Sequence, residues 1–151
     1  MGQSLAKLYV HLIFGTKRHY PFIKREWSGE LYAYMAGALK NYHSPAIIIN
    51  GASEHVHILF CLSKNHALAK VVEEVKKQSS KWVKQKSFNS KFTWQIGYAA
   101  FSVSSSKVEI VKTYIANQQA HHKKKTFREE VMEFMKKYNI IEFEEKFFFD
   151  E

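Results

Sequence analysis

The strongest constraint on the fold is the order in which alternating and helical patterns follow one another along the chain. Runs in which apolar and polar side chains alternate favour strands, whereas apolar residues three and four positions apart favour helices. Here the patterns give strand, helix, strand, strand, helix, strand, and then further helices. No internal repeat and no low-complexity linker interrupts this order.

Each expected element rests on one such pattern. The strands are expected at Tyr9–Thr16, Ala46–Asn50, His55–Leu62 and Trp94–Val103. The two long helices are expected from about Lys24 to Tyr42 and from about Asn65 to Lys86. Two Ser/Thr-x-x-Glu capping boxes predict a helix from Ser106 to about His121 and a short one from Thr126. We therefore predict an α+β, ferredoxin-like (RRM-like) split βαβ fold, with one antiparallel sheet, helices on one face and the other face free for a site.

Size and composition exclude several classes of protein. The 151 residues fit a single domain, residues 1–151. With 46% hydrophobic and 25% charged residues, the chain has a globular composition. The single cysteine, Cys61, excludes an internal disulfide and a cysteine-based zinc cage. Apolar runs are too short to span a bilayer, and the start lacks a secretory pattern, so we expect a cytoplasmic protein without a membrane partner.

The charge balance points to a polyanionic partner. The formal net charge is +9, which favours nucleic acid over an anionic membrane, although basic surfaces also serve solubility. The candidate DNA-binding residues lie on the second and third helices and in the basic run that follows: Lys76, Lys77, Lys81, Lys84, Lys107, Lys123, Lys124 and Lys125. Such lysines would contact phosphates without reading sequence.

Two histidines stand out on the third strand. Val56, Ile58, Phe60 and Leu62 alternate toward the helices, so His55 and His57 project together onto the opposite, open face. Two imidazoles at i and i+2 can converge on one metal ion or one phosphate, but half-exposed strand histidines without a task are also common. His11 is a chance neighbour or a supporting residue on an adjacent strand. The next alternate position is Leu59, which argues against a histidine-triad hydrolase.

The helix after Ser106 carries a second pair. Tyr114 and Gln118 lie one turn apart and share one stripe of the helix. Alone, a helical tyrosine is usually part of a core and a nearby glutamine is usually solvated. The pair indicates a functional site only when it is considered together with the histidines of the third strand.

The joint pattern resembles the single-tyrosine HUH transposases, which act on single-stranded DNA, and their REP-associated tyrosine transposase relatives. The resemblance runs from about Leu8 to Tyr138 and is carried by four stretches: Glu54–Phe60, Trp94–Tyr98, Phe101–Ser104 and Val111–Gln118. It implies that Tyr114 attacks a scissile phosphate and forms a 5′-phosphotyrosine. It also implies that His55, His57 and Gln118 hold a divalent metal, Mg²⁺ or Mn²⁺. No base for Tyr114 stands out, and the acidic-aromatic tail Glu142–Glu151 has no match.

The same resemblance implies the partners of the chain. Relatives recognise hairpins near element ends and work as homodimers, in which the tyrosine helix of one subunit completes the histidine site of the other. The run Ser104–Ser106 would be the hinge for such an exchange in trans.

Three other interpretations remain open from the sequence. One is an RRM-like module that binds single-stranded nucleic acid without cutting it, although its inner strand would carry His55 and His57 in place of glycine and aromatic residues. Another is a replication or relaxase nuclease, which usually needs more chain or a third histidine. The last is a domesticated tyrosine nuclease that processes chromosomal repeats.

Overall fold

A four-stranded antiparallel sheet forms the centre of the computed structural model, which describes residues 2–138. The strands are β1 (Leu8–Gly15), β2 (Ala46–Gly51), β3 (His55–Leu62) and β4 (Ala99–Val103). Their order across the sheet is β2-β3-β1-β4, with β1 antiparallel to both β3 and β4. This order is the one expected for a split βαβ arrangement, so the predicted fold class is confirmed.

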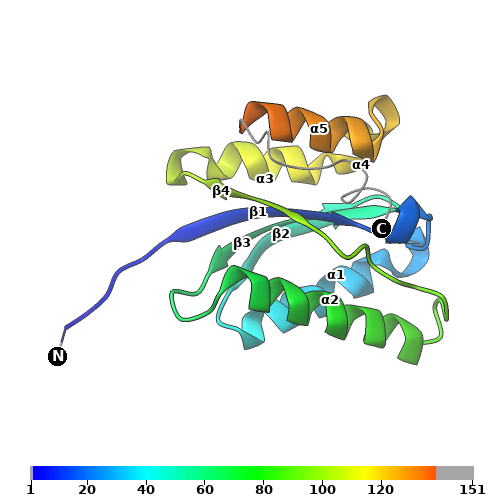
Figure 1. Cartoon of the computed structure of the whole chain (residues 1–151), viewed down its shortest axis with the longest axis horizontal. Helices are drawn as coiled ribbons and strands as arrows, with labels where there is room; N and C mark the ends of the chain where they lie inside the picture. The colour runs from blue at the N-terminus through cyan, green and yellow to red at the C-terminus, as the bar shows by residue number, and fades with distance from the viewer. Residues whose placement is uncertain (1, 139–151) are drawn as a thin grey trace.

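Helices lie on both sides of this sheet (Figure 1). One layer holds α1 (Arg25–Asn41) and α2 (Leu68–Gln85), and the other holds α3 (Val108–Ala116), α4 (Gln118–Lys124) and α5 (Phe127–Lys137). Two short 3-10 turns, Lys17–His19 and Ser105–Lys107, precede α1 and α3. No helix among residues 2–138 is both long enough and apolar enough to cross a membrane.

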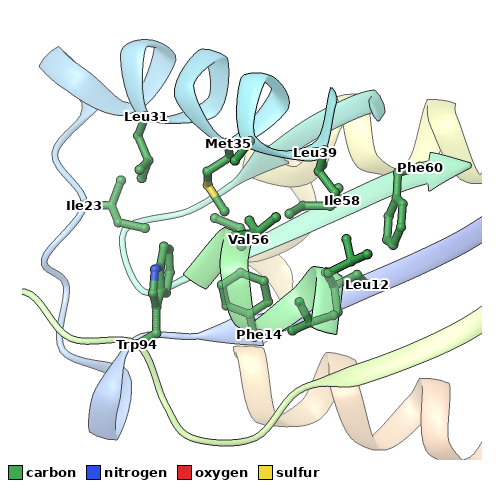
Figure 2. Packing of buried hydrophobic residues seen from close by; sticks show 14 of the residues in the cluster. Leu12, Phe14, Ile23, Leu31, Met35, Leu39, Val56, Ile58, Phe60 and Trp94 are labelled. Carbon is green, nitrogen blue, oxygen red and sulfur yellow. The ribbon is translucent and has the colours of Figure 1, made fainter. Parts of the chain in front are cut away.

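The larger core lies between the sheet and the layer of α1 and α2 (Figure 2). Alternate residues of β1 and β3 point into it, as the two-residue period of a strand requires. Its buried members include Leu12, Phe14, Val56, Ile58 and Phe60 from the strands and Leu31, Met35 and Leu39 from α1. The apolar stripe of α2, which includes Val71, Val72 and Val75, closes this core as predicted.

The second face of the sheet is not free, and here the sequence-based expectation is wrong. The helices α3 to α5 cover it, and both His55 and His57 are completely buried. The physical reason is that this face also carries apolar side chains. Ile13 packs with Phe127 and Val131 of α5, and Leu59 packs with Ile115 of α3.

The fourth strand is shorter than predicted. Trp94 makes only an isolated bridge to Thr16, and regular pairing begins at Ala99. Between them the side chain of Lys76 donates to the carbonyl oxygens of Ile96 and Gly97, at 2.8 and 3.1 Å. These carbonyls bond to α2 and not to β1, so the chain leaves the sheet over this stretch.

The later helices also differ from the predicted pattern. The capping box at Thr126 is confirmed, with reciprocal 3.1 Å bonds between Thr126 and Glu129. The one expected at Ser106 does not form, because a 3-10 turn occupies Ser105–Lys107. The helix predicted to run to His121 breaks at Asn117 into α3 and α4. The acidic-aromatic tail Glu142–Glu151 lies outside the described residues.

Candidate functional site

The expected histidine pair lies at the centre of a buried polar cluster. His55 and His57 project from β3 toward α4 and α5, as the alternation of the strand predicted. The Nδ1 atom of His57 lies 2.8 Å from Nε2 of His11 on β1. His11 therefore supports His57 directly, whereas the sequence left open whether it was a supporting residue or a chance neighbour. All three imidazoles are completely buried.

Glu130 joins this cluster from α5, and the sequence analysis missed it. Its Oε1 atom accepts a short hydrogen bond from Nε2 of His57 and lies 3.7 Å from Nε2 of His55. Its exposed fraction is only 2%. The available signal was its position: Glu130 follows Phe127 by three residues and precedes Phe134 by four, so a carboxylate occupies the inward stripe of the helix.

Gln118 reaches the same cluster because the helix breaks just before it. Its Nε2 atom lies 3.1 Å from Nε2 of His55 and 2.9 Å from Oε2 of Glu130. The break is stabilised by Asn50 of β2, which donates to the carbonyl oxygen of Ile115 at 3.0 Å. That bond satisfies a carbonyl group at the end of α3 and lets α4 start in a new direction. The Oε1 atom of Gln118 is buried and has no hydrogen-bond partner among the described residues.

Tyr114 lies at the edge of the cluster. Its ring centroid is 5.9 Å from that of His57, and the ring stacks on His121 at 4.3 Å. The pKa of Tyr114 is raised far above its ordinary value, first by burial and then by the charge and hydrogen bonding of Glu130. In the bare protein the phenol is therefore protonated. Tyr114 and Gln118, which the sequence placed on one helix, belong to two helices, and each contacts a different histidine of the cluster.

Burial and hydrogen bonding fix the charges of the cluster. Burial lowers the pKa of His57 to about 4, against the opposing hydrogen bond to Glu130, so the ring is neutral at pH 7. Burial raises the pKa of Glu130, but the hydrogen bond and charge of His57 outweigh it and bring the value to about 2. The cluster thus holds the carboxylate anion of Glu130 next to the neutral imidazole of His57.

A second carboxylate orients His55 from behind. Nδ1 of His55 lies 2.7 Å from Oε1 of Glu54, and the other carboxylate oxygen lies 3.2 Å from Nε2 of His122. An ionised carboxylate only accepts hydrogen bonds, so Nδ1 of His55 donates to Glu54. This bond leaves Nε2 of His55 facing Gln118 and Glu130, at 3.1 and 3.7 Å. Carboxylates often fix metal-binding histidines in this way.

The donor atoms of this cluster suit a divalent metal. His55, His57 and Glu130 each offer a ligand atom, and these atoms lie within 4.8 Å of one another. The unpartnered Oε1 of Gln118 is a further oxygen that turning the amide would bring to the same point. Imidazole nitrogen with carboxylate and amide oxygen is a usual donor set for a first-row divalent ion.

The candidate DNA-binding lysines fall on two sides of the sheet. Lys76, Lys77, Lys81 and Lys84 belong to α2, in the layer away from the histidines. Lys76 is half-buried under its two carbonyl partners, and Lys77 pairs with Glu74 at 2.8 Å.

The remaining lysines lie on the same side as the cluster. Lys107 is exposed next to the start of α3. Lys123, Lys124 and Lys125 line a groove of about 430 Å³ that also includes Glu54 and His122. Lys125 also pairs with Glu133 at 2.5 Å.

Comparison with known proteins identifies the family of this chain. Residues 4–118 match the sequence pattern of a family described as "Transposase IS200 like". The match makes the chain a transposase and hence a DNA-processing enzyme. It covers well over half of the chain, which therefore belongs to the IS200-like transposase family. No protein in the curated set matches the chain.

Two solved structures share the fold. One is a crystal structure of a transposase candidate from Deinococcus radiodurans R1, with 21% identity, a TM-score of 0.59, and coverage of 78% of this chain and 96% of that chain. The other is a REP-associated tyrosine transposase bound to a REP hairpin, with 12% identity, a TM-score of 0.60, and coverage of 81% and 73%. At these identities the likeness extends to the fold only.

The neutral state of His57 predicts a pH dependence of stability. Its pKa falls from 6.5 in the unfolded chain to about 4 in the folded protein. Below pH 6.5 the unfolded chain binds a proton that the folded protein excludes, so stability is lost as the pH falls toward 4. We expect the metal-free protein to lose about 3 kcal/mol of unfolding free energy over this range. Burial lowers the pKa of His11 as well, which adds in the same direction.

Urea denaturation in the presence of a chelator, at pH 7 and near pH 4, measures this loss. His43→Asn removes an exposed histidine whose φ of 53° asparagine tolerates, so it should leave the pH dependence unchanged. Equal stability of the wild-type protein at both pH values would contradict the neutral assignment of His57.

Proposed function

We propose that this transposase cleaves and rejoins single-stranded DNA at the ends of a mobile element, with Tyr114 as the nucleophile. The observation that carries the proposal is that one chain gathers Tyr114 beside His57 and Gln118 beside His55. These residues come from β3, α3 and α4. Apolar packing alone would not bring polar side chains from these three elements together in a buried site.

The proposed reaction is a transesterification. The phenol oxygen of Tyr114 forms a bond to the scissile phosphorus, and the bond from phosphorus to the 3′-oxygen breaks. The phenol proton is lost and the 3′-oxygen gains one, which leaves a 3′-hydroxyl and a 5′-phosphotyrosine. Attack by another 3′-hydroxyl reverses the step and releases Tyr114. The number of phosphoester bonds is conserved, so rejoining needs no external energy source.

The raised pKa of Tyr114 shows why such a phenol needs assistance. We propose that His55, His57, Gln118 and Glu130 hold Mg²⁺ or Mn²⁺, and that the ion would polarise the scissile phosphate and offset the charge of Glu130. The two nitrogen ligands favour Mn²⁺, whereas the carboxylate of Glu130 brings the set closer to the oxygen ligands that Mg²⁺ prefers. Glu130 thus adds a negative charge that the sequence-based ligand set lacked.

The basic groove beside the cluster supports a path for the DNA strand. We propose that Lys123, Lys124 and Lys125 contact backbone phosphates there, because the same groove reaches Glu54 and so the back of His55. The four lysines of α2 lie across the sheet and would serve, at most, the flanking DNA. Since the REP-associated relative is described as bound to a REP hairpin, we propose a hairpin-bearing single strand as the substrate.

An RRM-like binding module is less well supported. Such a module stacks bases on an exposed sheet face. In residues 2–138 one face of the sheet packs on α1 and α2 and the other on α3 to α5. Neither face can hold a strand of nucleic acid in this way. A domesticated repeat-processing nuclease would use the same site and differs only in its genomic role.

Replacing the nucleophile is the direct test. Incubation of the protein with single-stranded hairpin oligonucleotides and Mn²⁺ should give a protein–DNA adduct that survives denaturing electrophoresis. Tyr114→Phe should abolish the adduct and retain DNA binding, because only the hydroxyl is lost. Tyr20→Phe, at an exposed tyrosine, is the matched control and should form the adduct normally. An adduct in Tyr114→Phe would place the nucleophile elsewhere.

The role of Glu130 can be measured without DNA. If its carboxylate is a metal ligand, Glu130→Gln should raise the dissociation constant for Mn²⁺ at least 10-fold in calorimetric titrations. Glu133→Gln, one turn along and exposed, should leave this constant unchanged. An unchanged dissociation constant in Glu130→Gln would show that the carboxylate is not a ligand. A lower constant would show that the carboxylate opposes binding of the ion.

A mixing experiment tests whether Tyr114 and the histidines of one site belong to the same chain. The expected homodimer with exchange in trans stays a prediction, but the described contacts support a site built in cis. We therefore expect a mixture of Tyr114→Phe and His57→Ala proteins to form no adduct. An adduct on the His57→Ala chain would show that the tyrosine acts in trans. Co-purification of differently tagged chains establishes whether mixed dimers are present.

A further inference from the structure

A second cavity lies next to Tyr114, on the side away from the basic groove. It has a volume of about 210 Å³ and lies between α3, α5 and the buried face of β1. Its lining includes Tyr114, Phe134, Tyr138 and His11. Ile110 and Tyr138, with exposed fractions of 61% and 36%, form its mouth.

The aromatic walls of this cavity are held in place by their neighbours. Tyr138 stacks on Phe101 of β4 with ring centroids 4.5 Å apart and an interplanar angle of 11°. Phe134 is nearly parallel to Tyr138, at 17°, and meets Tyr114 edge-on with centroids 5.6 Å apart. A flat ring that entered the cavity would therefore meet aromatic surfaces already oriented by the protein.

Besides its two tyrosines, the cavity lining includes three polar side chains: Glu133 and Lys137, which are exposed, and His11. Its side chain is completely buried, and its Nδ1 atom has no hydrogen-bond partner among the described residues. Its other nitrogen is used, because Nε2 bonds to His57. Buried polar atoms normally have partners, so an unpartnered nitrogen on a residue that lines the cavity is the feature that a ligand with a polar edge would satisfy.

We propose that this cavity binds one unpaired nucleobase of the strand that Tyr114 attacks, stacked on the aromatic walls and hydrogen-bonded to Nδ1 of His11. The step from cavity to DNA rests on the proposed function: a phosphate within reach of Tyr114 brings its adjoining nucleotide to the mouth. A base has a flat face for Phe134 and Tyr138 and polar atoms on its edge for His11. Lys137, also in the lining, adds a positive charge near the backbone of that nucleotide.

The size of the cavity favours a single base over larger occupants. Its volume corresponds to roughly seven water molecules at about 30 Å³ each, which suits one ring system and not a base pair. Drug-sized ligands usually occupy larger pockets, of about 300 Å³ or more. The proposal gives the site a means to select unpaired DNA, because a base within a duplex is not available to enter the cavity.

Photo-cross-linking tests this proposal without knowledge of the target sequence. The probe is a single-stranded oligonucleotide of mixed sequence in which 5-iodouracil replaces thymine, bound to the Tyr114→Phe protein so that no cleavage occurs. We expect mass spectrometry to locate cross-links at Phe134 or Tyr138. Tyr138→Ala in the same background should weaken binding about 10-fold, as expected for the loss of one stacked base. Tyr34→Ala, on α1 across the sheet, should not weaken it.

A second measurement covers the case in which Tyr138→Ala perturbs folding. In Tyr114→Phe protein labelled with ¹⁵N at histidine, the Nδ1 resonance of His11 should shift when the unmodified oligonucleotide is added. Cross-links confined to other surfaces, or a His11 resonance that does not move while DNA binds, would overturn the proposal. Failure of the wild-type protein to form a tyrosine adduct would refute the proposed function instead, so the two failures are distinguishable.

Discussion

A carboxylate buried against two imidazoles is the interaction on which the second half of this structure depends. An ionised carboxylate pays a large desolvation penalty unless its oxygens are bonded. Glu130 bonds to His57 and to Gln118, and its exposed fraction is only 2%. These partners lie on β3 and α4, so α5 can bury this charge only when it docks over the histidine strand. The polar cluster therefore fixes where the C-terminal helix packs.

The same cluster explains why one face of the sheet is mixed in character. Covering a purely apolar face with α3 to α5 would cost less desolvation free energy. Nevertheless His11, His55 and His57 lie on this face beside Ile13 and Leu59. Each histidine makes at least one hydrogen bond within the cluster, which reduces the cost of its burial. Among the buried atoms without a hydrogen-bond partner in residues 2–138 are Oε1 of Gln118 and Nδ1 of His11, the two atoms for which we propose a ligand.

The break at Asn117 directs Tyr114 and Gln118 to different places. In a continuous helix Tyr114 and Gln118 would lie on one stripe, one above the other. Asn50 bonds to the end of α3, and Gln119 bonds back to Asn50 at 3.0 Å, so β2 holds both sides of the break. Gln118 then turns into the cluster while Tyr114 stays at its edge, between His57 and the second cavity.

The sequence alone determined the order of the strands and the two long helices, since these follow from local periodicity and the apolar stripes of β1, β3 and α2. It also placed His55 and His57 on the face opposite the main core, and it singled out Tyr114 and Gln118. Only the tertiary structure decided that this face is covered, that β4 begins at Ala99, that the helix breaks at Asn117, and that Glu130 and His11 join the site. These outcomes depend on hydrogen bonds between residues far apart in the chain, such as Lys76 with Ile96, Asn50 with Ile115 and His57 with Glu130. Local periodicity predicts on which face of a strand or helix a side chain lies. It does not predict which residue from a distant part of the chain contacts that side chain.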